Sequence, residues 1–216
     1  MASWMVHLRI TDKLLNLIPN LSDTEFIVGN IAPDSGVPNA DWSTFLPGTA
    51  VSHFRVDNGQ GKKIIEIQRY VENYFTPELR ATYNEQQYSF YLGYYTHLLT
   101  DTIWSELVAR PVRKQFPQVS WEEIKEDWYD LDFLYIKKHP GFRAFRAYLG
   151  SVGFVNRYMD FFAPDAFDNR REYITSFYLQ PKENLDREYR YLTETAANEF
   201  VEVAAARILA RLEESL

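Results

Sequence analysis

Residues Tyr88 to Val108 read YSFYLGYYTHLLTDTIWSELV, and this stretch decides how the rest of the chain is interpreted. Apolar and aromatic residues occupy nearly every angular position of a helix built from it, so no fully polar face remains. A helix of this kind belongs in the middle of a core rather than on a surface. The sequence therefore predicts a central buried helix with the other elements packed around it.

Three residues of the predicted central helix share one stripe, namely Gly93, His97 and Asp101, spaced four apart. Because burial of an unpartnered carboxylate is costly, Asp101 needs a cation or hydrogen-bond donors. A His and an Asp one turn apart, with a glycine that leaves space above them, can hold a metal ion. The same pair can also satisfy itself and fix helix packing without any ion. These residues alone leave both interpretations open.

Length and composition favour one globular domain. The 216 residues suffice for one sizeable core, so we expect a single domain over residues 1–216. The net charge of −7 argues against a broad basic surface for nucleic acid or anionic membrane. Short basic clusters such as Arg170-Arg171 are interpreted as solvated faces or helix C-terminal charges. The absence of cysteine excludes a disulfide framework and a thiolate metal site.

The chain shows no targeting or membrane signal. Its first residues lack a basic segment followed by an apolar one, and no run of about 18 apolar residues is present to span a bilayer. We therefore expect a soluble cytoplasmic protein without a transmembrane segment.

Helical periodicity and capping patterns extend through most of the chain. The predicted helices cover residues 3–18, 22–31, 63–75, 76–111 (either unbroken or bent near Gly93), 120–139, 141–149, 153–162, 168–178 and 182–213. An alternating strand pattern occurs only over residues 51–56. The prediction is an all-α, single-domain, multi-helix bundle.

Residues 32–62 are the least regular part of the sequence. They contain three prolines and four glycines without a sustained period, which predicts a long loop. Loops of this length inside a compact domain are often functional. This one contributes Asp34 and His53.

The four histidines are unevenly placed. His139 precedes a proline at a predicted helix end and is interpreted as a C-terminal cap or an exposed residue. The others, His7, His53 and His97, fall on an apolar helix face, in the long loop and in the central helix. The chain has no His-Asp dipeptide, no His-Glu-x-x-His and no Gly-x-Ser-x-Gly, which argues against several hydrolase classes.

The candidate ligands fall within four short strings. They are W-x-x-H from Trp4 to His7, G-N-I-A-P-D-S-G over residues 29–36, S-H-F over residues 52–54 and G-x-x-x-H-x-x-x-D over residues 93–101. Together these strings resemble the zinc-dependent phospholipase C family, which is related to the S1/P1-type nucleases and has an all-α fold around a metal cluster. The resemblance is clearest over residues 4–104.

The resemblance implies a ligand set. Asp34, His53, His97 and Asp101 would surround one ion, and Asp101 would bridge to a second ion held also by His7. Imidazole and carboxylate suit zinc, with manganese, iron or nickel as other candidates. The implied activity is hydrolysis of a small-molecule or lipid phosphate ester by a metal-activated hydroxide, with Asp34 as a catalytic base.

Two other functions stay open. The chain is interpreted alternatively as a metal-binding protein without catalysis, or as a metal-free helical protein with an interaction or structural role. In three-metal members of the family the third ion takes two further histidines and a glutamate, but only His139 follows Asp101 here. We therefore expect one or two ions.

Several residues receive weaker assignments. Four carboxylates beyond the central motif are candidate ligands or, alternatively, a solvated acidic helix face. They are Glu106, Asp127, Asp130 and Asp132. Trp4 is internal, whereas secreted family members bind metal through an N-terminal Trp amine, so Trp4 is interpreted as a core residue.

Overall fold

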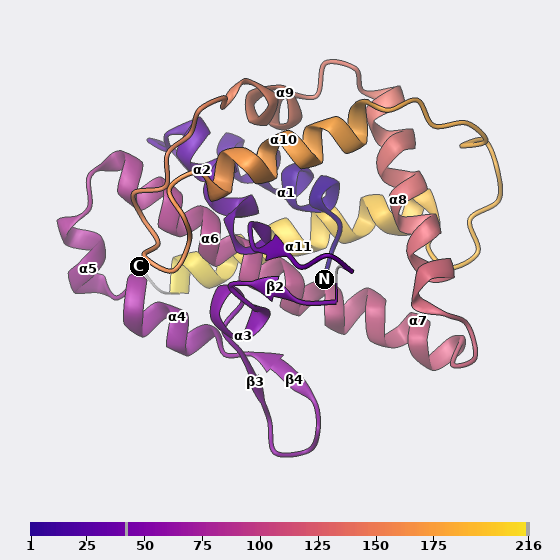
Figure 1. Cartoon of the computed structure of the whole chain (residues 1–216), viewed down its shortest axis with the longest axis horizontal. Coiled ribbons are helices and arrows are strands. Elements are labelled where there is room, and N and C mark those ends of the chain that lie inside the picture. The colour runs from indigo at the N-terminus through magenta and orange to yellow at the C-terminus, as the bar shows by residue number, and fades with distance from the viewer. Residues whose placement is uncertain (42, 215–216) are drawn as a thin grey trace.

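The computed structural model describes residues 1–41 and 43–214, and most of these residues are helical, which confirms the all-α class (Figure 1). Residue 42, inside the predicted loop, and residues 215–216 lie outside the described part. The first half contains α1 (Trp4–Leu17), α2 (Asp23–Ile31), the 3-10 turn η1 (Ala32–Asp34), β1 (Val37–Pro38), β2 (Phe45–Leu46), α3 (Thr49–Ser52), β3 (Arg55–Asp57), β4 (Lys63–Ile65), α4 (Ile67–Tyr74), α5 (Pro77–Thr82) and α6 (Glu85–Trp104). The second half contains the π-helical turn η2 (Ser105–Ala109), α7 (Arg110–Gln115), α8 (Trp121–Lys138), α9 (Arg143–Gly150), α10 (Ala166–Leu179) and α11 (Glu194–Glu214).

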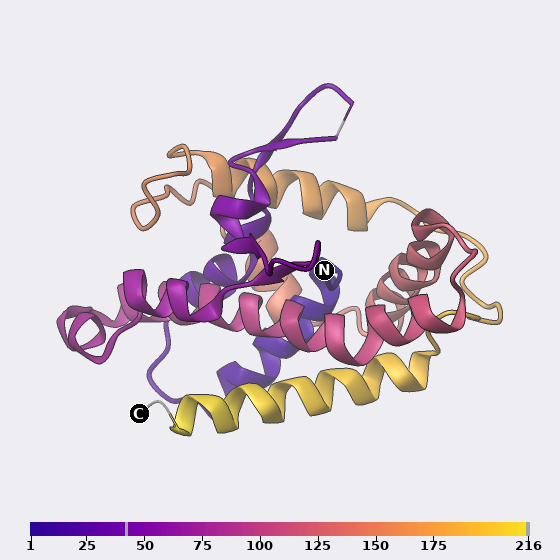
Figure 2. The same cartoon turned by 90° about the horizontal axis from the view of Figure 1, so that it is seen from below.

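Helix α6 is the buried centre of the fold, as the sequence predicts. Helices α1, α2, α4 and α11 all pack against it, and Figure 2 shows its ribbon running above α11 through the middle of the molecule. A capping box starts the helix, because the Asn84 side chain accepts from the Gln87 amide and the Gln87 side chain accepts from the Asn84 amide. The helix expected from residue 76 is therefore interrupted at residues 83–84, and α6 continues through Gly93 without interruption.

Two glycines allow α2 and α6 to touch through their backbones. A Cβ on Gly93 would lie 2.3 Å from the Phe26 carbonyl oxygen and 2.8 Å from the Asn30 amide nitrogen. A Cβ on Gly29 would lie 2.2 Å from the Phe90 carbonyl oxygen. The idea that Gly93 leaves space for an ion is wrong, because α2 fills that space.

The π-helical turn η2 changes how the central helix ends. The helix was expected to stop at Pro111, but helical backbone continues through α7 to Gln115. Pro111 lies in the first turn of α7, where a missing amide hydrogen is tolerated. The Arg110 side chain also donates from Nε to the Ser105 carbonyl oxygen at 3.1 Å, so that carbonyl is satisfied.

The predicted loop at 32–62 contains short regular elements. Strands β3 and β4 form an antiparallel hairpin that projects from the helices in Figure 1, and β1 pairs with β2. Gly59 and Gly61 have φ of +77° and +71°, which suits the tight connection. The predicted helix at 63–75 therefore begins only at Ile67, and the predicted strand at 51–56 is partly helical, since α3 covers residues 49–52.

The helix predicted at 153–162 is absent because Asn156 binds the neighbouring backbone. Its Oδ1 accepts from the amides of Tyr158 and Met159, and its Nδ2 donates to the carbonyls of Met159 and Phe162. Asparagine side chains commonly stabilise irregular backbone in this way, at the expense of helical hydrogen bonds. Gly153, with φ of +75°, precedes this turn.

The predicted helix at 182–213 begins only at Glu194, because ion pairs and a hydrogen bond hold the preceding segment against α8. Arg187 bonds Asp127 at 2.6 Å and Asp130 at 2.8 Å, and the Tyr191 amide donates to Asp127 at 2.7 Å. The solvated-face interpretation is therefore wrong for Asp127 and Asp130, which are buried. It is right for Glu106, which is exposed and lies 3.2 Å from Arg207.

Asp132 is the third buried carboxyl of α8, and it contacts two hydroxyl groups rather than a cation. Ser3 Oγ lies 2.8 Å from its Oδ1, and Tyr178 Oη lies 2.6 Å from its Oδ2. Burial raises the pKa of Asp132 to about 7. The interpretation of Asp132 as part of a solvated face is thus also wrong.

Replacement of Gly93 by alanine is expected to lower the free energy of unfolding by roughly 1–3 kcal/mol or more, since overpacking usually costs that much. The physical reason is the backbone contact with α2, which a methyl group must push apart. Denaturant unfolding would measure the change. Gly150→Ala is the matched control, because no atom lies within 4 Å of the corresponding Cβ position. Equal stability of the two variants would contradict the close-contact explanation.

Asp132→Asn is expected to remove a pH dependence of stability. The folded pKa of about 7 exceeds the ordinary 3.8, so the native state binds an extra proton between these values. The wild type should accordingly lose stability as the pH rises from about 4 to about 7, by up to about 1.4 kcal/mol per pH unit from this group. Denaturant unfolding at pH 5 and pH 8 would compare the two proteins. The exposed control Asp186→Asn should keep the wild-type pH profile.

Candidate metal centre

The five residues singled out in the sequence come together in the structure. His7 comes from α1, Asp34 from the end of η1, His53 from the residue after α3, and His97 and Asp101 from α6. All three histidines and Asp101 are buried, and Asp34 is largely so. The loop residues and the helix residues thus form one cluster.

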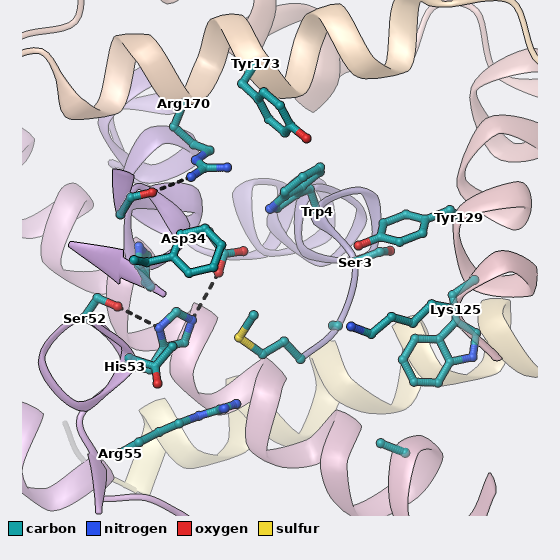
Figure 3. Close-up of a pocket in the computed structure, with 18 of the residues that line it drawn as sticks. Ser3, Trp4, Asp34, Ser52, His53, Arg55, Lys125, Tyr129, Arg170 and Tyr173 are labelled. Atoms are coloured by element: carbon teal, nitrogen blue, oxygen red, sulfur yellow. Dashed lines mark hydrogen bonds and ion pairs between the residues drawn. The ribbon is translucent and has the colours of Figure 1, made fainter. Parts of the chain in front are cut away.

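His53 lies at the middle of one half of the cluster. Its Nε2 is 3.2 Å from Asp34 Oδ1 and 3.2 Å from His97 Nε2. Asp101 Oδ2 lies 3.9 Å from the Nε2 atoms of both histidines. Two imidazole nitrogens and two carboxylate oxygens therefore face a common point, and Figure 3 shows the Asp34–His53 pair from the cavity side.

His7 and Asp101 form the other half. His7 Nε2 is 3.5 Å from Asp101 Oδ1, and the His7 ring stacks on the His97 ring with centroids 3.9 Å apart. Asp101 Oδ1 also accepts a hydrogen bond from the Ala2 amide at 2.8 Å. Each oxygen of the Asp101 carboxylate thus faces a different set of histidine nitrogens.

Two of the histidines are oriented through their second nitrogen. His97 Nδ1 donates to the Asn30 carbonyl oxygen at 2.6 Å, which leaves the lone pair of its Nε2 directed at the cluster. His53 Nδ1 lies 2.9 Å from Ser52 Oγ. Metal-binding histidines usually have such a partner, because it fixes the tautomer and the ring plane. His7 Nδ1 has no hydrogen-bond partner among the described residues.

The electrostatics of the cluster require further positive charge. Burial opposes ionisation of Asp34, but the hydrogen bond to His53 and the nearby His97 outweigh it and hold the pKa of Asp34 below its usual range. The pKa of Asp101 is also held well below its usual range, since the neighbouring amino terminus and histidines outweigh burial. Burial lowers the pKa of His97 to about 3, so this ring is neutral. Two carboxylates are ionised here, and within residues 1–41 and 43–214 no Lys or Arg lies within 4 Å of either.

Several buried polar atoms of the cluster are unsatisfied. His7 Nδ1 and Nε2 and Asp101 Oδ2 have no hydrogen-bond partner in the described part of the chain. A buried donor or acceptor without a partner is destabilising. One divalent cation beside Asp101 Oδ2 and another beside His7 Nε2 would satisfy these atoms and would compensate the two carboxylates. The donor set of imidazole and carboxylate therefore fits zinc or a related metal.

The geometry defines two groups of possible ligands. Asp34, His53 and His97 form one, and His7, His97 and Asp101 form the other, each with ligand atoms within 4.8 Å of one another. His97 occurs in both groups, but its Nδ1 is occupied by Asn30, so only Nε2 is available. A carboxylate has two oxygens, and those of Asp101 face the two groups separately. Asp101 is therefore better suited than His97 to link two ions.

A cavity of about 660 Å³ adjoins the cluster. Asp34 and His53 form part of its wall, whereas His7, His97 and Asp101 lie behind them and do not line it. Trp4 also lines the cavity and packs edge-on against Tyr173 at 5.9 Å between centroids. Trp4 is half-buried, so its interpretation as a core residue holds for only one side of the ring.

Other residues of the site were not identified from the sequence. Asn30 acts through its backbone carbonyl, which the string G-N-I-A-P-D-S-G contains but does not reveal. Ser52 lies in the string S-H-F, which suggests no role for it. Its Oγ contacts His53 Nδ1, and its backbone carbonyl accepts a hydrogen bond from the Tyr94 hydroxyl. His139 is exposed, with Nδ1 2.8 Å from the Tyr135 carbonyl, which confirms its interpretation as a cap.

Comparison with known proteins bears on the same segment. Residues 6–104 match the family model described as zinc dependent phospholipase C, and this range includes all five clustered residues. No curated protein and no solved structure matches the chain. Within the described residues, no helix combines the length and apolarity needed to cross a membrane. Over residues 6–104 the chain is therefore similar to zinc-dependent phospholipase C, as its motifs predict.

Proposed function

We propose that this protein is a metal-dependent phosphoesterase that hydrolyses a small-molecule or lipid phosphate ester. The observation that carries the proposal is the convergence of His53, His97 and Asp34 on one point at the wall of a cavity. The unsatisfied atoms behind that point and the family match over the same residues support it.

Each of the five residues has a distinct role in the proposal. Asp34, His53, His97 and one oxygen of Asp101 would hold the first ion. His7 and the other oxygen of Asp101 would hold the second, for which the described residues offer fewer ligands. When bound, such ions supply Lewis-acid chemistry, which activates water and polarises a phosphoryl oxygen.

Asp34 is the carboxylate best placed to take part in proton transfer. It is the one acidic side chain among the described residues lining the cavity, whereas Asp101 lies behind it. Its lowered pKa keeps it ionised at neutral pH. Asp34 can therefore orient a water molecule and accept its proton on the cavity side, in addition to binding metal.

Two alternative functions make different predictions. A metal-binding protein without catalysis would bind ions and hydrolyse no ester. A metal-free helical protein would bind none, and its histidines would pair only with the carboxylates. The unsatisfied His7 and Asp101 atoms favour a bound ion over the metal-free alternative.

The protein as purified is expected to contain one or two equivalents of zinc, manganese, iron or nickel per chain. His97→Ala should lose most of this metal, because both ligand groups include His97. His139→Ala is the matched control, since that histidine is exposed and outside the cluster. Elemental analysis measures the content, and a chelator should lower the melting temperature of wild type but not of metal-free His97→Ala.

The same preparations test catalysis. Wild type and His139→Ala should hydrolyse bis(p-nitrophenyl) phosphate or a related soluble ester, and chelation should abolish turnover until metal is restored. Metal-loaded protein without turnover on a broad panel of esters would support the non-catalytic alternative. Absence of metal after reconstitution would refute both metal-dependent functions.

Asp101→Asn is expected to cost more metal affinity than His7→Ala. The reason is that Asp101 faces both ligand groups, whereas His7 faces one. Competition with a chromophoric chelator would measure the affinity of each variant. Equal losses, or a larger loss in His7→Ala, would show that Asp101 does not bridge two ions.

A further inference from the structure

Within the described residues, a buried arginine in the cavity wall has no acidic partner. Arg170 on α10 is only 7% exposed, and its Nη2 donates to the Gly36 carbonyl oxygen at 2.6 Å. No carboxylate lies within 4 Å of its guanidinium in the part of the chain described. Buried arginines are normally paired with an anion, because an uncompensated charge in the interior is costly. The interpretation of Arg170-Arg171 as a solvated basic face is thus wrong for Arg170.

The guanidinium of Arg170 has unused donors on the cavity side. An arginine has five N–H donors in a planar fork, and the backbone bond to Gly36 uses one of them. Figure 3 shows this guanidinium beside the cavity, near Asp34. The bond to Gly36 also fixes its position, so the fork is preorganised for a planar or tetrahedral oxyanion.

Two further cations line the same cavity. Arg55 comes from β3 and Lys125 from α8, and neither has an ion-pair partner among residues 1–41 and 43–214. In Figure 3 they extend toward the cavity from opposite sides. Among the described lining residues, the Lys and Arg side chains thus number three and the carboxylates one, Asp34, although the chain as a whole carries a net charge of −7.

From this arrangement we propose that the cavity is an anion subsite centred on Arg170, with Arg55 and Lys125 at its rim. The subsite selects phosphate esters that carry a further anionic group over esters with a cationic choline head group. The selection among substrates rests on the proposed phosphoesterase function, whereas binding of an anion by Arg170 does not require turnover. The cavity of about 660 Å³ is in the usual size range of small-molecule sites.

Aromatic side chains of the cavity suggest the opposite selectivity, a preference for a choline head group. Trp4, Tyr129 and Tyr173 line it together, and aromatic rings can bind quaternary ammonium groups. Three cations around one cavity oppose such a ligand, however, because like charges at close range are repulsive. The rings then serve to pack against an apolar part of the substrate.

The first experiment measures the affinity of inorganic phosphate by calorimetry on the protein as purified, with whatever metal it holds. Arg170→Gln should weaken binding at least about tenfold, in line with loss of charge-assisted hydrogen bonds. Arg170→Lys should lie between Arg170→Gln and wild type, since it keeps the charge and loses the fork. Arg146→Gln, an exposed change of the same kind on α9, should bind phosphate like wild type. Unchanged affinity in a folded Arg170→Gln would overturn the proposal.

A second variant avoids the buried position. Arg55→Gln combined with Lys125→Gln should weaken phosphate binding about threefold or more at low ionic strength, and less at high salt because salt screens exposed charges. If Arg170→Gln does not fold, unchanged affinity in this double variant would overturn the subsite.

Selectivity is tested with glycerol 3-phosphate and phosphocholine as probes. Wild type should bind glycerol 3-phosphate more tightly than phosphocholine, and the difference should shrink in Arg170→Gln and in the double variant. Equal affinity of the two probes in wild type, or a preference for phosphocholine, would refute the charge selection.

The outcomes separate this proposal from the proposed function. If the protein holds no metal or hydrolyses no ester while Arg170→Gln loses phosphate affinity, the anion subsite stands and the phosphoesterase function fails. If metal and turnover are present while Arg170→Gln binds phosphate like wild type, the function stands and the subsite fails.

Discussion

The backbone contact between α2 and α6 is the constraint on which the site depends. Gly29 and Gly93 have no Cβ, so the helices approach until the Asn30 carbonyl reaches His97 Nδ1 at 2.6 Å. That bond orients His97 Nε2 toward the cluster. Because η1 follows α2 directly, the same contact also brings Asp34 to the end of α6 that carries His97. Helix packing and ligand geometry are therefore set by one feature.

Two groups of buried carboxylates in this fold are compensated in different ways. Asp127 and Asp130 on α8 form ion pairs with Arg187. Their negative charge is therefore balanced by a side chain of the protein, and the same pairs attach the segment before α11 to α8. Among the described residues, Asp34 and Asp101 have no Lys or Arg partner; their neighbours are histidines, one of which is neutral, the backbone amide of Ala2 and the nearby amino terminus. The first group is complete as it stands, whereas the second is complete only with a cation.

The features of the site that could be predicted from the sequence are mainly those that depend on the spacing of residues within one helix. The all-round apolar character of α6 and the four-residue spacing of His97 and Asp101 are properties of one helix, so the central helix and its stripe were predictable. The irregular segments at 153–162 and 182–193 were not, because they depend on side-chain bonds of Asn156 and on the pairing of Arg187 with residues 57 and 60 positions away. Arg170 was missed for the same reason, since its partner Gly36 is 134 positions distant.

The metal cluster and the cationic cavity share one short turn of the chain. Asp34 faces His53, and two residues later the Gly36 carbonyl holds Arg170, so residues 34–36 connect both sets of charges. A Cβ on Gly36 would lie 2.8 Å from the Pro47 carbonyl oxygen, which ties this turn to the chain just before α3 and His53. The segment after residue 104 offers a single exposed histidine, and hence no histidine pair for a third ion, yet it contributes Lys125 and Arg170 to the cavity. The cavity therefore takes two of its three cationic side chains from the part of the chain that lies beyond the matched residues 6–104.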